Sequence, residues 1–200
     1  MKCPKILMVL SYVIVIAGCT VGPDKRETPA SFDFGPPRVV ASTPAINATL
    51  LIPAVQASPW LDSSSIIYRL NYRDAGRAEV YAQNRWTMTP ALLLTERLRT
   101  RFAAAARGVV TPQDGAKADV VLRIDLDDFS QSFEDEKSSA ANVRLRATLI
   151  DANTRTLRAQ RAFSVARPAA PNAPGAAQAL AAASDALIED LAVWAAQTLK

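Results

Sequence analysis

VVLRIDLDDF (residues 120–129) is the stretch that decides the fold, because hydrophobic and polar side chains alternate along it. Alternation with a period of two is typical of a β-strand that buries one face. The stretch VRLRATLI (143–150) repeats the pattern, with arginines on its polar face where the first stretch carries aspartates. Opposite charges favour each other across neighbouring strands. The two stretches are therefore predicted to pair as antiparallel strands.

Further stretches extend this sheet. After the turn-forming DANTR, the stretch LRAQRAFSV (157–165) predicts a third strand beside the pair. Nearer the amino terminus, ATLLIPAVQ (48–56) is predicted to be the first strand. IIYRLNY (66–72) and AEVYAQ (78–83) flank RDAGR, in which aspartate and glycine favour a turn. A hairpin is therefore predicted there.

Two helices complete the predicted domain. Thr89 and Pro90 suit a helix start, as a capping residue and a first-turn proline, and Gly108 is expected to end that helix. After a loop at 167–175, an alanine-rich helix runs to the end of the chain. The side chains expected to face inward are Leu94, Leu98, Phe102 and Ala105 in the first helix and Leu180, Leu187, Leu191 and Trp194 in the second. Those expected to point largely outward are Arg97, Arg99 and Arg101.

The predicted order is three strands, a helix, three strands and a second helix. Strands grouped in this way favour an α+β fold in layers. The expected architecture is a mainly antiparallel sheet of about six strands, with two long helices packed on one face.

The first twenty residues indicate a lipoprotein signal. Lys2 and Lys5 precede the apolar run 6–17. This run is too short for a membrane-spanning helix, which needs about 20 apolar residues, and it suits the apolar region of a secretion signal. Small residues then lead to Cys19, an arrangement that looks like a bacterial lipobox. Acylation of Cys19 would anchor the chain in a membrane, whereas the alternative is an ordinary signal with a chance cysteine.

The domain boundaries follow from this signal and from proline content. Residues 1–18 are expected to be the signal peptide, 19–47 a lipidated, proline-rich tether, and 48–200 the folded domain. FDFGPP (32–37) could instead pack on the edge of the domain. Thr20 stands where an aspartate would favour retention at the inner membrane, so the outer membrane is the expected location.

Composition excludes several classes of function. Removal of residues 1–18 leaves 21 basic side chains facing 19 acidic ones, with no basic run to follow a phosphate backbone, so nucleic acid is not an expected partner. The chain contains no histidine, and no thiol remains free once Cys19 is acylated. Ser-His-Asp and Cys-His sites and histidine-ligated zinc are therefore excluded. No glycine-rich phosphate loop is present either. We expect no enzyme activity and no cofactor.

Two further groups of residues are candidate binding sites, the acidic side chains within 125–137 and the tryptophans. Six carboxylates gather in DLDDF and FEDEK (125–137), but no calcium-loop glycine follows them, which favours a solvated strand end and loop over a metal site. Of the tryptophans, Trp86 and Trp194 are expected in the core, and Trp60 could lie in the core or on a lipid or partner surface.

Four segments taken in order resemble the ABC-type transport auxiliary lipoprotein family, which includes the lipoprotein of the paraquat-inducible intermembrane transport system. They are WLDSSSIIYRL, AEVYAQNRWTMTPALLLTERL, ADVVLRIDLDDFSQSF and LRATLIDANTRTLRAQRAFSV. The resemblance runs from about Phe32 to the final helix. It implies no catalytic residues, and only Cys19 carries over, as the lipid attachment site. The pairs Tyr68-Arg69 and Arg85-Trp86 match the family pattern and are interpreted as supporting the fold.

The resemblance implies a periplasmic lipoprotein that works with an MCE-domain protein, an ABC permease and an ATPase to move lipids or other hydrophobic compounds between the inner and outer membranes. It also implies a domain that can self-associate. The alternatives are a structural lipoprotein of envelope assembly without a transporter, and a lipid-anchored hydrolase.

Overall fold

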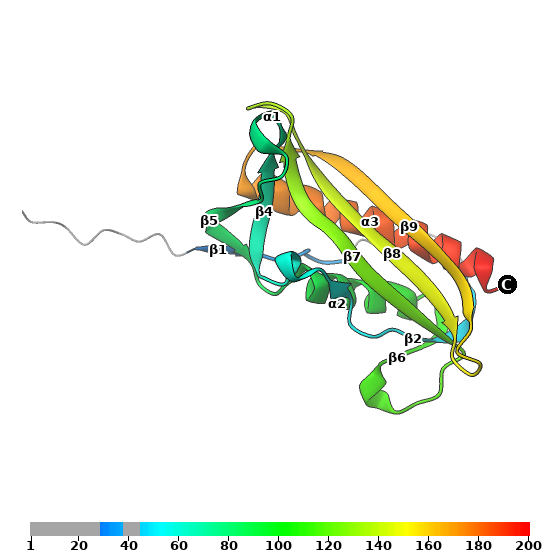
Figure 1. Cartoon of the computed structure of the whole chain (residues 1–200). Coiled ribbons are helices and arrows are strands. Elements are labelled where there is room, and N and C mark those ends of the chain that lie inside the picture. Colours follow the sequence, from blue (N-terminus) through cyan, green and yellow to red (C-terminus); the bar gives the residue numbers. More distant parts are fainter. Residues whose placement is uncertain (1–28, 38–44) are drawn as a thin grey trace, which may run out of the picture.

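The computed structural model describes residues 29–37 and 45–200. The expected signal peptide and Cys19 lie outside the described residues. The backbone of the fold is a long antiparallel meander (Figure 1). Its three strands are β7 (Val120–Phe133), β8 (Ser139–Asp151) and β9 (Leu157–Ala169). The antiparallel pair predicted from the alternating stretches is confirmed.

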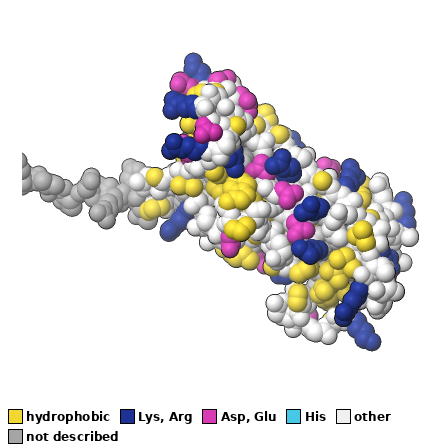
Figure 2. Space-filling view, in the orientation of Figure 1, with side chains coloured by type: hydrophobic (Ala, Val, Ile, Leu, Met, Phe, Trp, Pro, Cys, Tyr) yellow, Lys and Arg dark blue, Asp and Glu magenta, His cyan; other side chains and the backbone are white. Residues whose placement is uncertain are grey.

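Charge pairing on the outer face of β7 and β8 follows the predicted pattern. Asp125 lies opposite Arg146 in the register, with 4.0 Å between the charged atoms, and Asp128 lies 3.6 Å from Arg144. Figure 2 shows the two signs side by side on this face. Because all four groups are partly solvated, these pairs set the register more than they stabilise the fold.

The other edge of β7 is covered by three short strands that run parallel to it. They meet β7 near its start, its middle and its end, through the pairs Leu50–Val120, Gln56–Asp125 and Tyr68–Gln131. These strands are β2 (Ile46–Leu51), β3 (Gln56–Ala57) and β4 (Ser65–Leu70). Strand β7 is therefore paired on both edges.

The remaining strands extend the sheet from these short ones. Strand β5 (Glu79–Trp86) pairs antiparallel with β4 across the short helix α1 (Asn71–Asp74), which confirms the predicted hairpin. Strand β1 (Ala30–Phe32) adds to β5 in parallel, and β6 (Ala106–Val110) adds to β2 in parallel.

The expectation of about six mainly antiparallel strands is wrong. The described residues form one nine-stranded mixed sheet within an α+β fold. Alternation reveals a half-buried strand but not its direction. Strands β1, β3 and β6 are too short, at 3, 2 and 5 residues, to show the pattern. The predicted strand 48–56 is in fact divided between β2 and β3.

Helix α2 (Pro90–Ala103) begins as predicted and ends earlier. The hydroxyl oxygen of Thr89 accepts a hydrogen bond from the Leu92 amide at 3.4 Å. Gly108 does not end the helix, because the chain turns back after Ala103 and Gly108 lies within β6. The expected loop at 167–175 is also shorter, since β9 continues to Ala169. Two 3₁₀ turns, η1 (Pro59–Leu61) and η2 (Pro112–Asp114), connect other elements.

Two of the three arginines expected to point outward from α2 are in fact enclosed. Arg101 forms a bidentate ion pair with Glu189 of helix α3 (Ala173–Thr198), with N–O distances of 2.6 to 2.8 Å. Arg97 is 8% exposed. The prediction failed because the second helix packs beside α2 and supplies carboxylates on that side.

Helix α3 (Ala173–Thr198) crosses β8 and β9 behind the sheet as drawn in Figure 1. Its start is tight, since a Cβ on Gly175 would lie 2.6 Å from the carbonyl oxygen of Ala170. Leu180, Leu187 and Leu191 are fully buried as predicted. Trp194 is half-buried and packs edge-to-face on Phe163 at 5.6 Å. Side chains of both long helices and of the inner sheet face join one hydrophobic core.

The last residue of β8, Asp151, has a strongly perturbed carboxyl group at the point where the turn to β9 begins. Amide donors from Thr154 and Asn153, together with the Arg158 guanidinium, hold the pKa of Asp151 well below its ordinary value. A lowered pKa in the folded state stabilises the fold above the unfolded-state value of about 4, and the contribution is lost as the pH falls toward the folded-state value.

Asp151→Asn should therefore lower the free energy of unfolding at pH 7, and the difference from the parent protein should narrow below about pH 4. Urea unfolding of both proteins at a series of pH values measures this difference. An unchanged difference down to pH 2 would contradict the assignment.

Candidate functional site

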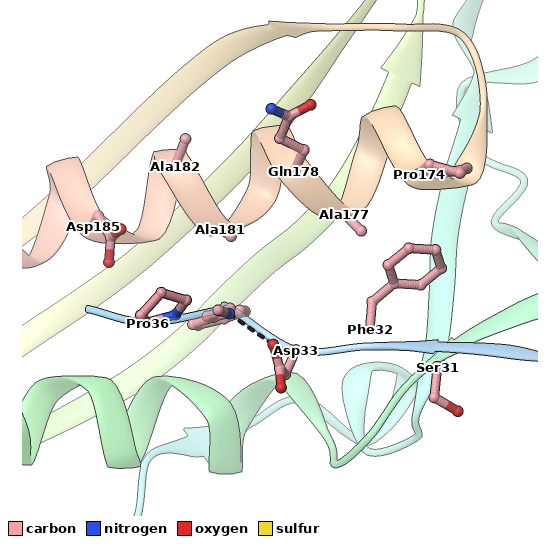
Figure 3. A pocket seen from close by; sticks show the side chains of 12 residues that line it. Ser31, Phe32, Asp33, Pro36, Pro174, Ala177, Gln178, Ala181, Ala182 and Asp185 are labelled. Atoms are coloured by element: carbon pink, nitrogen blue, oxygen red, sulfur yellow. Dashed lines mark hydrogen bonds between the residues drawn. The ribbon is translucent and has the colours of Figure 1, made fainter. Parts of the chain in front are cut away.

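The amino-terminal residues 30–37, here called the strap, lie against the folded domain between α2 and α3 (Figure 3). Strand β1 fixes the first part of the strap, and the Thr87 amide donates to the Phe32 carbonyl at 2.8 Å. Of the two alternatives for FDFGPP, the structure shows packing on the domain. The strap is therefore the point at which the amino-terminal part of the chain meets the fold.

A tight turn gives the strap its shape. The Asp33 carboxylate accepts a hydrogen bond from the Gly35 amide at 2.7 Å, and Gly35 has a φ of +63°. Glycine takes this left-handed conformation without the steric cost that a Cβ imposes. The turn directs the intervening Phe34 side chain inward.

Phe34 inserts into the hydrophobic core and is 8% exposed. Its ring meets Trp86 edge-to-face at 5.8 Å and stacks on Phe129 at 5.9 Å, and those two rings lie 5.6 Å apart. Edge-to-face and offset-stacked pairs add about 0.5–1.5 kcal/mol beyond area burial. The strap therefore contributes one member of a three-ring cluster to the core.

Arg97 holds the strap from the other side. Its Nη2 donates to the carbonyl oxygens of Phe34 and Gly35, each at 2.7 Å. Its Nε lies 3.6 Å from the Asp185 carboxylate on α3. One buried guanidinium from α2 thus joins the strap to both long helices.

Grooves flank the strap on both sides. The larger, of about 440 Å³, lies between the strap and the first half of α3, where small side chains such as Ala177 and Ala181 line it. The smaller, of about 210 Å³, lies between the strap and α2. Carboxylates border both, with Asp33 in each and Asp185 in the larger.

The acidic residues of DLDDF and FEDEK do not come together as a metal site. Asp125 and Asp128 face the arginines of β8. The Asp135 carboxylate accepts from the amides of Lys137 and Ser138, which lowers its pKa. Among residues 29–37 and 45–200, no group of three or more acidic or cysteine side chains is placed to hold a metal ion.

The tryptophans differ in exposure. Trp86 is buried, as predicted. Trp60 is 39% exposed, and the Arg69 guanidinium lies over its ring at 5.0 Å. Among the described helices, none is long and apolar enough to cross a membrane.

The sequence analysis missed Arg97 and Asp185, the two charged side chains that enclose the strap. The available signal was FDFGPP itself, in which aromatic residues surround an aspartate and a glycine that together form a turn. Nothing local to Arg97 marks it, because its acceptors are backbone carbonyls 62 and 63 positions earlier.

Replacing Arg97 should loosen the strap. In Arg97→Leu the amide of Thr87, which is bonded to Phe32, should exchange with solvent about 10- to 100-fold faster, since hydrogen bonds to charged groups contribute about 1.5–3 kcal/mol. Hydrogen exchange followed by NMR measures this rate. The matched control is Arg85→Leu, whose exposed side chain makes only a 3.4 Å contact with Ser31 and should change the rate little. An equal hydrogen-exchange rate of the Thr87 amide in both variants would show that Arg97 does not hold the strap in place.

The fold is similar to solved structures of bacterial proteins. Protein XCC0632 from Xanthomonas campestris superimposes with a TM-score of 0.73 at 24% identity, over 82% of this chain and 93% of that one. The hypothetical protein CT253 from Chlamydia trachomatis gives a TM-score of 0.54 at 6% identity, over 76% of this chain and 98% of that one. At these identities the likeness concerns the fold. A search of curated proteins found no match.

The family comparison covers most of the described chain. The model for the ABC-type transport auxiliary lipoprotein component matches residues 32–192, which include the strap from Phe32 onward, the whole meander and most of α3. The chain therefore belongs to the ABC-type transport auxiliary lipoprotein family.

Proposed function

We propose that this chain is a lipid-anchored, non-enzymatic auxiliary subunit of an ABC transport system that contains an MCE-domain protein, a permease and an ATPase. The system moves lipids or other hydrophobic compounds between the inner and outer membranes. The subunit is held by acylated Cys19 and faces the periplasm, at the outer membrane. The observation that carries this proposal is the family match over residues 32–192, and the lipobox-like sequence before Cys19 supports it.

The position of the strap limits how far the domain can lie from its anchor. Ten residues lie between Cys19 and Ala30, where β1 begins, so eleven Cα-to-Cα steps join the two. Fully extended, they reach at most about 40 Å. The docked strap thus keeps the domain close to the membrane, whereas a free tether of residues 19–47 would allow more than twice that reach. A subunit placed so close to a bilayer suits the end of a conduit that delivers hydrophobic cargo.

The contacts of the strap fix the point on the domain at which the anchored part of the chain arrives. Phe34 is part of the core, and Arg97 binds the strap carbonyls from α2. Force that reaches the strap is therefore passed to the hydrophobic core through Phe34 and Arg97. A rigid point of attachment of this kind suits a subunit that positions a partner protein at a membrane.

Changing Cys19 to alanine tests the anchor. We expect Cys19→Ala to move the protein from the membrane fraction to the soluble periplasmic fraction, because one or two acyl chains supply the membrane affinity. Its circular dichroism should stay that of the parent domain. The alanine variant remaining in the membrane fraction would contradict the proposal.

Cross-linking in native membranes, followed by purification in detergent and mass spectrometry, tests the partner. The proposal predicts an MCE-domain protein attached to the parent chain. Recovery of envelope-assembly proteins without any MCE protein would favour the structural alternative.

A further inference from the structure

One long edge of the sheet has no partner within the described part of the chain. Strand β9 is 13 residues long and pairs only with β8, so its outer edge presents backbone donors and acceptors. Exposed edges of this kind are sites at which an extended peptide can add as a further strand. In Figure 1 β9 forms the outer border of the meander, with α3 behind it.

A groove runs beside this edge. It has a volume of about 490 Å³ and lies between the middle of β9 and the last turns of α3. The half-buried Trp194 and the 36% exposed Val193 supply apolar surface, and Phe163 lies beneath them at 6% exposure. A strand added to β9 would bury alternate side chains in this groove.

All charged side chains on β9 are positive. Arg158, Arg161 and Arg167 lie along the strand, and residues 157–169 include no acidic side chain. Arg158 is bound by Asp151. For Arg161 and Arg167, no ion pair is found among the described residues, and Arg161 lies over the Phe163 ring at 5.0 Å. Asp190 is the one acidic residue among those that line the groove.

The positive charge of β9 distinguishes between two possible partners for its edge, a second copy of this chain and another protein. Pairing of β9 with β9 of a second copy would bring together the Arg161 and Arg167 side chains of both copies without an acidic residue on either strand, and like charges on neighbouring strands repel. We propose that the free edge of β9 binds an extended, acidic segment of another protein by strand addition. The proposal goes beyond the transport role and does not require that the partner be the MCE-domain protein.

The register defines what that segment must look like. Arg161, Phe163, Val165 and Arg167 lie opposite residues of β8 that are fully buried, so all four positions fall on the face toward α3. An added strand therefore needs two acidic residues six positions apart on one face, with apolar residues at the two alternate positions between them. This pattern reads the same in both directions, so it holds for parallel and antiparallel addition.

The synthetic peptide TETVTVTET has this pattern and serves as the probe, with TKTVTVTKT as its charge-reversed control. NMR titration of the full-length chain with the acidic peptide should shift the amides of β9 and of the α3 residues that line the groove. Exchange of Arg161 and Arg167 for glutamate should raise the dissociation constant about tenfold or more, which corresponds to about 1.4 kcal/mol. The same double variant should instead bind the lysine peptide.

Arg73→Glu with Lys117→Glu is the matched control, since it makes an equal charge change at two exposed side chains away from β9 and should leave binding unchanged. Three results would overturn the proposal. The acidic peptide at millimolar concentration could leave the β9 amides unshifted. The charge reversal could leave its affinity unchanged. Light scattering could show that the parent chain forms an oligomer that the Arg161 and Arg167 reversals dissociate, which would make a second copy the occupant.

Discussion

The apolar inner face of β7 and β8 must be covered, and the helices and the strap are arranged around this requirement. Side chains such as Leu122 and Leu145 are fully buried there, and burial of a large aliphatic side chain contributes about 1.5–3 kcal/mol. Helices α2 and α3 and the Phe34 ring of the strap all join the core that covers this face. Because Phe34 is a core residue, the strap belongs to the folded domain instead of lying beside it. The place where the strap enters the domain is set by the same burial that stabilises the fold.

This arrangement separates two tasks in space. The strap, held by Arg97 between the two long helices, carries the connection toward the lipid anchor. The β9 edge lies on the far side of the meander from the short strands β2, β3 and β4. Within the described part of the chain, no strand pairs with this edge, and no ion pair of Arg161 or Arg167 is found. The proposed roles are attachment through the strap and recognition through the β9 edge, and both depend on geometry and charge.

The parts of the fold that were predictable from sequence are those with strong local patterns. The alternation in 120–129 and 143–150 revealed β7 and β8, and Thr89-Pro90 revealed the start of α2. The failures arose where the deciding partner is distant in sequence. Strand β6 pairs with β2, so Gly108 was misread as a helix end. Arg101 is enclosed by Glu189, 88 residues later. The strap also depends on a distant partner. The sequence FDFGPP indicates a turn, but it does not reveal that the carbonyl oxygens of Phe34 and Gly35 accept hydrogen bonds from Arg97.

The proposed attachment requires that the strap stays docked when the protein is anchored in a membrane. The position of the strap can be measured directly by pulsed electron spin resonance between nitroxides at Ser31→Cys and Gln160→Cys, with the protein anchored in phospholipid vesicles. Both side chains are exposed, so the labels should not disturb the core. A docked strap predicts a single narrow distance distribution that is the same in vesicles and in detergent. A broad distribution, or one that widens when the protein is anchored, would show that the strap detaches and would contradict the account.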